Sequence, residues 1–306
     1  MNISEKQLLI SIQPTDNAID NILLINKNNL LVSFKNYGYI YIYNLITFEI
    51  ISKIEFPNKN KSITYNILLK DKRLAHSSHD NNIYITKKLD NDQYIINEIL
   101  NEHKDKILKV IELKNEQICS CSIDQTIKVW EKNNNKKFFL KYNLKDLKEE
   151  FYSIIEISDN IIISTSEKDN SHVINFWKIN EKKVFNSITN NNICLWNNNC
   201  IKIEENVLAI TGKNKILIII YDNEKTKTIK NFDINGIFFS IYRIKNNNFL
   251  IGDLDGNIYE IKYQNKEFTL IAAKKNIHID LITCFCELNN GTLISSSNDK
   301  ILKIFI

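Results

Sequence analysis

Apolar and polar residues alternate with period two through short segments that are separated by polar turns. The clearest unit, residues 105–132, reads DKILKVIELKNEQICSCSIDQTIKVWEK and begins with an apolar strand, a polar turn and a second strand. A tight turn at Asp124 and Gln125 then leads into a third strand that ends at Trp130. Alternation of β-branched and aromatic residues with polar ones is typical of half-buried β-strands. The pattern therefore predicts an all-β chain.

The same order of strands and turns returns along the whole chain. Further copies lie at residues 29–43, 62–86, 161–177, 207–220, 248–261 and 281–305. The third strands of the seven copies are predicted to end at Tyr43, Thr86, Trp130, Trp177, Ile220, Ile261 and Phe305. By subtraction these positions are 43, 44, 47, 43, 41 and 44 residues apart, and the spacing of 47 is assigned to a longer surface loop between Ser166 and Val173. Such a period, with four short strands per unit, is that of propeller blades.

The third unit also carries a set of four polar and aromatic residues. His103 precedes its first strand, Ser120 lies in the second strand, Asp124 lies in the tight turn and Trp130 ends the third strand. This set resembles the WD-repeat family, whose repeat has these residue types in these places and hydrogen-bonds them to one another within a blade. The resemblance implies a structural tetrad, and we interpret the His–Asp pair as structural and not as a catalytic base.

A partial copy of the same set stands in the last unit. His278, Ser295 and Asp299 occupy the corresponding places, with Phe305 where the tryptophan would stand. By subtraction the histidine and the aspartate are 21 residues apart in both sets. The other units depart further from the family pattern.

The resemblance implies a seven-bladed β-propeller that is one domain over residues 1–306, built from four-stranded antiparallel blades. The blades are expected at residues 14–57, 58–102, 103–148, 149–191, 192–233, 234–275 and 276–306, the last together with residues 4–13. The segment Lys6–Ile12, KQLLISI, is strand-like and precedes the first repeat. We therefore expect it to close the ring as the outer strand of the seventh blade, because that blade otherwise lacks a fourth strand.

No motif of nucleotide or hydrolase chemistry stands in the chain: the patterns G-x-x-x-x-G-K-[ST], G-x-G-x-x-G, H-E-x-x-H and G-x-S-x-G are missing. Cys119 with Cys121 and Cys284 with Cys286 have C-x-C spacing inside predicted strands, which favours buried core residues over a zinc site. The run Asp253–Asn257 alternates acids like a calcium loop but lacks the distal Glu, so we interpret it as a tight turn. No metal and no cofactor is expected.

Composition narrows the compartment and the partners. The net charge is +4 and the pI about 8.5, a basic bias too slight to indicate nucleic-acid binding by itself. The N-terminus lacks the pattern of a signal peptide, and the longest apolar stretch, Ile216–Tyr221, is far shorter than the roughly 20 residues of a membrane span. We expect an intracellular protein without membrane insertion, in the cytoplasm or, alternatively, in the nucleus.

The resemblance implies a non-enzymatic scaffold or adaptor that binds other proteins or peptides, as a monomeric propeller within a larger complex. In such propellers the usual docking surface is the channel mouth together with the face that carries the fourth-to-first and second-to-third strand connections. The residues expected on this face are Tyr37, Lys104, Lys106, Tyr152, Trp196, Phe239 and Asp280.

Two other functions stay open at this point. An RNA- or ribosome-associated propeller requires Lys and Arg to cluster on one face, and the polar run Lys132–Lys137 is either part of such a patch or a solvated loop. A propeller hydrolase requires acids or histidines that converge from the innermost strands. Those strands are mostly apolar, as in KILKVIEL, so the sequence disfavours the hydrolase.

Overall fold

The computed structural model describes residues 3–145, 148–168, 171–190, 200–222 and 225–306, and these residues form strands and no helix. The chain divides into two compact units, Leu23–Asn191 and Met1–Ile22 with Asn192–Ile306, and we describe each by itself. Blades are numbered in chain order. We call the end of a blade with the second-to-third strand turn its tight-turn edge, and the end with the first-to-second and third-to-fourth turns its opposite edge.

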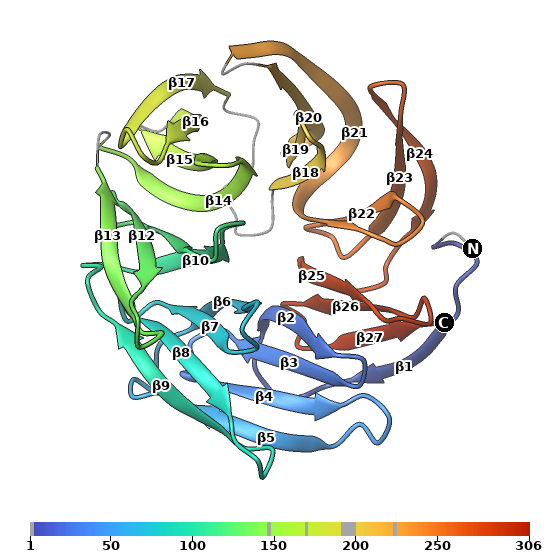
Figure 1. Cartoon of the computed structure of the whole chain (residues 1–306). Coiled ribbons are helices and arrows are strands. Elements are labelled where there is room, and N and C mark those ends of the chain that lie inside the picture. The colour runs from blue at the N-terminus through green and yellow to red at the C-terminus, as the bar shows by residue number, and fades with distance from the viewer. Residues whose placement is uncertain (1–2, 146–147, 169–170, 191–199, 223–224) are drawn as a thin grey trace. The chain divides into compact units, whose positions relative to one another are not determined.

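Blades one to four are antiparallel four-stranded sheets in which each strand pairs with the next one along the chain (Figure 1). Blade one contains β2 (Ile19–Asn26), β3 (Asn29–Phe34), β4 (Tyr39–Asn44) and β5 (Ile50–Glu55). Blade two contains β6 (Ile63–Leu68), β7 (Leu74–Ser78), β8 (Ile83–Lys88) and β9 (Tyr94–Leu100). Blade three contains β10 (Ile107–Glu112), β11 (Ile118–Ser122), β12 (Ile127–Lys132) and β13 (Phe138–Leu144). Blade four contains β14 (Glu150–Ser158), β15 (Ile161–Lys168), β16 (Ser171–Lys178) and β17 (Lys183–Thr189).

The other unit contains a seven-stranded sheet and a four-stranded one. The seven-stranded sheet is formed by β18 (Cys200–Glu204), β19 (Val207–Thr211), β20 (Lys213–Asp222), β21 (Lys225–Arg243), β22 (Asn248–Asp253), β23 (Ile258–Gln264) and β24 (Glu267–Lys274). Blade seven is formed by β25 (Ile282–Glu287), β26 (Leu293–Ser297), β27 (Leu302–Phe305) and β1 (Leu8–Ile12).

The seven-stranded sheet corrects the expectation that blades five and six separate between residues 233 and 234. Strand β21 runs through that point: it pairs with β20 as far as Ile237 and with β22 from Phe238 onward. Alternation of apolar and polar residues continues across the point, so no turn interrupts the strand. Gly236, with φ 143°, lies where the pairing changes, in a backbone region that favours glycine.

The extra residues of blade four are strand and not the surface loop predicted between Ser166 and Val173. Glu167 pairs with His172 and Lys168 pairs with Ser171, so the hairpin of β15 and β16 is longer than its counterparts. The prediction was wrong because polar side chains at a strand end leave the backbone free to continue its ladder.

A β-bulge recurs beside the end of each third strand. In blade three Val129 pairs with Tyr142 whereas Trp130 pairs with Leu140, so one residue of the outer strand is unpaired. The predicted third-strand anchors are all buried, and six lie at the corresponding step of their ladders: Tyr43, Thr86, Trp130, Trp177, Ile261 and Phe305. In blade five the bulge falls between Ile220 and Tyr221, so the corresponding residue is Tyr221 and the predicted anchor Ile220 is one residue early.

The core lies between the faces of successive blades within each unit. Ile83 of blade two packs in one buried cluster with Ile107 and Trp130 of blade three. In the other unit Leu250 of blade six and Phe285 of blade seven share a cluster. Each blade is therefore apolar on both faces, which explains why the middle strands read as nearly continuous apolar runs.

Recurring hydrogen bonds join successive blades at the opposite edge. A lysine in a first-to-second strand turn donates its backbone amide to a glutamate that ends the first strand of the next blade. The pairs, with their N···O distances, are Lys70 and Glu112 at 2.8 Å, Lys114 and Glu156 at 2.8 Å, and Lys245 and Glu287 at 2.6 Å. These bonds fix the opposite edge from one blade to the next.

The N-terminal segment is the outer strand of blade seven, as predicted. Strand β1 pairs antiparallel with β27, and the two chain ends lie side by side in Figure 1. Ahead of β1, Ile3 is buried in the cluster of blades six and seven, and its amide donates to the buried carboxylate of Glu260 at 2.5 Å. The segment is thus held by a strand ladder, an apolar side chain and a carboxylate.

Removal of residues 1–12 should lower the free energy of unfolding by at least about 2 kcal/mol, the value of one buried isoleucine, because it also opens the edge of β27. Urea denaturation and size-exclusion chromatography measure the two effects. Leu9→Ser is the control, since Leu9 is 55% exposed. A truncated chain that stays monomeric with the native midpoint would contradict the assignment.

Candidate partner-binding site at the tight-turn edge

In blade three the four predicted tetrad residues form one chain of hydrogen bonds. His103 Nδ1 lies 2.8 Å from Asp124 Oδ2, and His103 Nε2 lies 2.8 Å from Ser120 Oγ. Trp130 Nε1 donates to the same hydroxyl at 3.1 Å. Because a carboxylate only accepts, Nδ1 carries the imidazole proton and Nε2 accepts from Ser120. Both nitrogens of a neutral, buried histidine are therefore satisfied.

The carboxylate of Asp124 collects most of the donors at the turn. It accepts from the Lys104 amide at 2.9 Å, and from the amide and hydroxyl of Thr126 at 2.9 and 2.6 Å. Burial opposes its ionisation, but the hydrogen bonds from His103 and Thr126 outweigh burial and hold the pKa of Asp124 well below its usual range. Burial lowers the pKa of His103 more than Asp124 raises it, so the pair is a neutral imidazole and a carboxylate.

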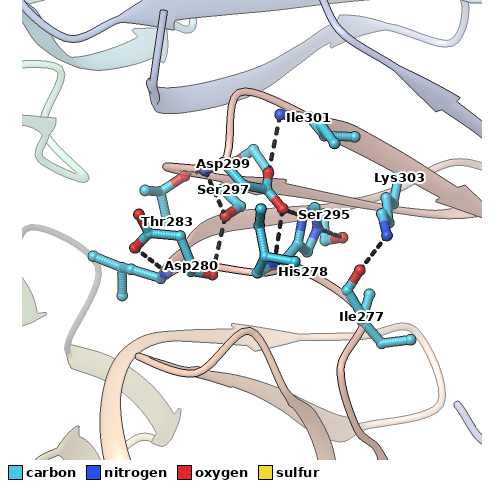
Figure 2. A network of polar contacts seen from close by, with 12 residues as sticks. Ile277, His278, Asp280, Thr283, Ser295, Ser297, Asp299, Ile301 and Lys303 are labelled. Atoms are coloured by element: carbon cyan, nitrogen blue, oxygen red, sulfur yellow. Dashed lines mark hydrogen bonds and ion pairs between the residues drawn. The ribbon is translucent and has the colours of Figure 1, made fainter.

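Blade seven contains the same arrangement without the indole (Figure 2). His278 Nδ1 lies 2.8 Å from Asp299, and His278 Nε2 lies 2.8 Å from Ser295. The Ile279 amide donates to Asp299 at 3.1 Å, as the Lys104 amide does in blade three. Phe305 is buried in the place of the tryptophan and offers no donor. The loop before the first strand is tied to the tight turn in both blades.

Blade two contains a buried histidine at a different position of the repeat. His76 stands in the second strand where blade three has Ser120, and it is fully buried. Its Nδ1 donates to Asn66 Oδ1 at 2.7 Å and its Nε2 accepts from Thr86 Oγ1 at 2.9 Å. With no carboxylate beside it, burial lowers the pKa of His76 to about 3.

Asp80, in the tight turn of blade two, and Asp253, the last residue of β22, bind tyrosines in place of histidines, and the sequence did not predict these two pairs. Tyr84 donates its hydroxyl to Asp80 at 2.5 Å in blade two, and Tyr259 donates to Asp253 at 3.1 Å in blade six. Burial and the aspartate raise the pKa of Tyr259 to about 12. The available signal was a tyrosine two residues before the third-strand anchor of a blade with an aspartate in its turn.

Four of the predicted partner-binding residues lie in the unit Leu23–Asn191. Lys104 and Lys106 are exposed on the loop before blade three, where their amides bind Asp124 and Asp105. Tyr37, in the tight turn of blade one, is 37% exposed, and its ring centroid lies 5.4 Å from that of Tyr39. These side chains stand at the tight-turn edge of their blades, as predicted from their offsets.

Tyr152 and Phe239 share a special position in their blades. Each is the unpaired residue of a β-bulge near the start of a first strand, between Phe151 and Ser153 in one case and between Phe238 and Ser240 in the other. Bulges re-aim side chains and are frequent beside functional sites.

The Tyr152 side chain is already hydrogen-bonded within its own blade. Its hydroxyl lies 3.1 Å from Glu150 and 3.3 Å from Glu167, and burial together with these carboxylates raises the pKa of Tyr152.

The last two predicted contacts differ in what can be said of them. Asp280, exposed on the loop before blade seven, caps the Leu281 amide at 2.6 Å and accepts the Ser297 hydroxyl through its carbonyl at 3.0 Å. Trp196 lies outside the described residues. Tyr37, Lys104, Lys106 and Tyr152 belong to one unit and Phe239 and Asp280 to the other, so the predicted set forms two groups.

The described residues bear on the sequence expectations for metal ligands and for the cysteines. They contain no group of three or more His, Cys, Asp or Glu residues that could hold a metal ion, and no helix that could cross a membrane. Cys119, Cys121, Cys200 and Cys286 are buried, as predicted, while Cys284 is half-buried and Cys194 lies outside the described residues. Burial raises the pKa of the Cys121 thiol to about 12. These thiols are packing residues.

Comparison with known proteins gives the class of the fold. Residues 96–131 match the family model described as WD domain, G-beta repeat. The crystal structure of the WD40 β-propeller domain of Doa1 is similar over 99% of this chain and 98% of that chain, with a TM-score of 0.76 and 15% sequence identity. No curated protein sequence matches the chain. The resemblance to the WD-repeat β-propellers is thereby confirmed: the chain has the fold of a WD40 β-propeller, and blade three carries a recognisable repeat of that family.

Asp124→Ala should lower the free energy of unfolding by about 1–3 kcal/mol, because it leaves buried donors of His103 and Thr126 without a partner. Asp255→Ala is a matched control: Asp255 holds the same turn position in blade six, is exposed, and makes no side-chain hydrogen bond to other described residues. Thermal and urea melts of both variants measure the difference. Equal stability of the two variants would show that the tetrad is dispensable.

His76 should make the protein less stable as the pH falls. In the unfolded chain His76 takes up a proton near pH 6.5, while in the native state its imidazole stays neutral down to about pH 3. The free energy of unfolding therefore has its full value above pH 6.5 and decreases as the pH falls below it. Between roughly pH 7.5 and pH 5 the loss is about 2 kcal/mol. Urea denaturation at both pH values should show a weaker pH dependence in His76→Ser, which installs the residue of blade three; an unchanged dependence would refute the assignment.

Proposed function

We propose that this protein is a non-enzymatic scaffold that binds partner proteins through the tight-turn edges of its blades. Proteins of the WD40 propeller class typically serve as interaction platforms, and loops held on a rigid framework commonly carry binding. The chain offers neither a nucleotide or hydrolase motif in its sequence nor a metal-binding group among its described residues, so the proposal rests on display of side chains and not on chemistry.

One observation carries the proposal. The residue after each tetrad histidine donates its amide to the turn aspartate, Lys104 to Asp124 and Ile279 to Asp299, and yet extends its side chain into solvent. Ile279 is 90% exposed. A large apolar side chain that is fixed by its backbone and bare to water loses little entropy when a partner covers it.

The backbone bonds at the two edges support the choice of the tight-turn edge for the proposal. At the opposite edge the turns are joined from blade to blade by the lysine amide and glutamate pairs, so their side chains serve the fold. At the tight-turn edge the aspartate bonds of blades three and seven run from the loop backbone to the turn of the same blade, while other backbone amides, such as those of Asn36 and His278, bind across to the neighbouring blade. The side chains of the loop therefore remain available for contact.

Lys104→Glu combined with Ile279→Ser should reduce recovery of the protein's partners about tenfold, because interface energy concentrates in a few anchored residues. The measurement is affinity purification of the tagged full chain from its native cell with quantitative mass spectrometry, after a melt shows the fold intact. Lys136→Glu with Leu270→Ser is the matched control, since Lys136 lies in an opposite-edge turn and Leu270 is 49% exposed on an outer strand. Loss of partners in the control but not in the test variant would place the site elsewhere.

A further inference from the structure

Lysines without a carboxylate partner gather at the tight-turn edge of blades two and three. Among the residues that the structure describes, none of their ammonium groups forms an ion pair or a side-chain hydrogen bond. They are Lys61, Lys104, Lys106, Lys128 and Lys145. They come from the loops that enter and leave blade three, from its third strand, and from the loop that enters blade two.

Part of the positive charge at the opposite edge of the same blades is paired, while Lys72, Lys136 and Lys137 there form no ion pair with any described residue. Arg73 binds Asp71 at 2.9 Å, and Lys132 reaches the same carboxylate at 2.9 Å. Lys114 binds Asp159 at 3.1 Å. Three basic side chains at the opposite edge are therefore neutralised by carboxylates, whereas none of the five tight-turn lysines forms an ion pair among the described residues.

Lys128 is the central cation of the group. It pairs through its backbone with Ser120 and Asn143, near the tight-turn end of strand β12, and only 4% of its surface is exposed. Burial lowers its pKa; the nearby acids Asp124 and Glu102 raise it and the neighbouring ammonium groups of Lys104 and Lys145 lower it. A confined cation among like charges gains strongly from an anion that arrives from outside.

The charge of blade three continues onto the turn of blade two. The amide of His79, in that turn, donates to the Ser62 carbonyl at 3.0 Å and so lies beside the loop of Lys61. Burial and the charges of Lys106 and Lys61 lower the pKa of His79 to about 4. Lys61 and Lys106 thus flank one turn, and the imidazole between them is neutral at physiological pH.

The nearest turn acids are already occupied by the fold. Asp80 accepts the Tyr84 hydroxyl, and Asp124 accepts from His103. Asp105 caps the Lys106 amide at 2.7 Å. These carboxylates bind turn residues and not the ammonium groups, so the lysines form no ion pair with them.

Resting on the proposed function, we propose that the tight-turn edge of blades two and three binds an acidic, Asp- and Glu-rich segment of a partner protein. Lys61, Lys104, Lys106 and Lys145 contact its carboxylates and Lys128 supports them from beneath. Complementary charge of this kind steers association and sets specificity.

A peptide suits the surface better than a nucleic acid. The chain contains two arginines, Arg73 and Arg243, and both are hydrogen-bonded at opposite edges, whereas planar phosphate recognition favours arginine. Towards blade four the surface meets the carboxylates of Glu150 and Glu167 on Tyr152, which would repel a continuing phosphate backbone. A short acidic segment ends before it meets them.

The test is fluorescence anisotropy of the full chain with a labelled peptide of about twelve residues that alternates Glu and Ser. A peptide with Gln in place of Glu and a single-stranded RNA of equal charge serve as comparison probes. Lys104→Gln, Lys106→Gln and Lys128→Met together should weaken binding of the acidic peptide at least about tenfold, and methionine keeps the buried stem of Lys128. The matched control removes three exposed lysines of the opposite edge, with Lys72→Gln, Lys136→Gln and Lys137→Gln, and should leave binding unchanged.

Each other outcome overturns the inference. Equal binding of the neutral peptide, or equal loss in the control variant, would show that these lysines do not recognise carboxylates. RNA binding as tight as peptide binding, lost in the same triple variant, would make the surface a nucleic-acid site. Absence of peptide binding while Ile279→Ser alone still loses partners would overturn the acidic partner and leave the proposed function intact.

Discussion

A buried carboxylate in the tight turn organises the end of a blade. In blade three the carboxylate of Asp124 binds the imidazole that precedes the first strand, the amide that follows it, and the turn residue Thr126. One group thereby joins the loop before the first strand to the tight turn, two backbone segments that no strand ladder connects. Because all its donors are inside the blade, the carboxylate stays ionised in spite of burial, and the geometry of the loop follows from that charge.

Blades two and four also place a hydrogen-bonded polar group near the tight turn, but they use other residue types. In blade two the hydroxyl of Tyr84 binds Asp80, and the second strand carries His76, which bonds to Asn66 and Thr86. Blade four has a buried Glu149 that accepts from Ser166 and Asn175. What is common to them is a satisfied polar group under the turn, since a buried polar group without a partner costs about 1–3 kcal/mol.

Fixing the loops inward also decides which charges are left for partners. Some opposite-edge lysines take part in bonds between blades, as Lys70 does when its amide binds Glu112, whereas tight-turn lysines such as Lys106 face solvent without a side-chain partner among the described residues. Ile279 and the lysine group around Lys128 lie in different units, and both follow from loops whose backbone is bound to a turn while their side chains stay free for contact.

Local pattern accounts for what could be predicted from the sequence. Period-two alternation located the third-strand anchors, because a strand buried on both faces must place large apolar residues where the blades meet. The residues of the blade-three set were found because four types at fixed spacing are rare together. The pairing of β1 with β27 followed from an unpaired segment at one end and an open sheet edge at the other.

Only the tertiary structure decided the rest. Glu260 and the amide of Ile3 are 257 residues apart, and no local pattern announces such a bond. The continuity of β21 past residue 233 depended on two sheets sharing one strand, and the lysines around Lys128 became a group only when loops from different blades met. The sequence by itself determined which segments are strands and which faces are buried, since those depend on neighbours along the chain. Partners across space determined which polar groups are satisfied and which remain open, because a hydrogen bond or an ion pair depends on distance and not on spacing in the sequence.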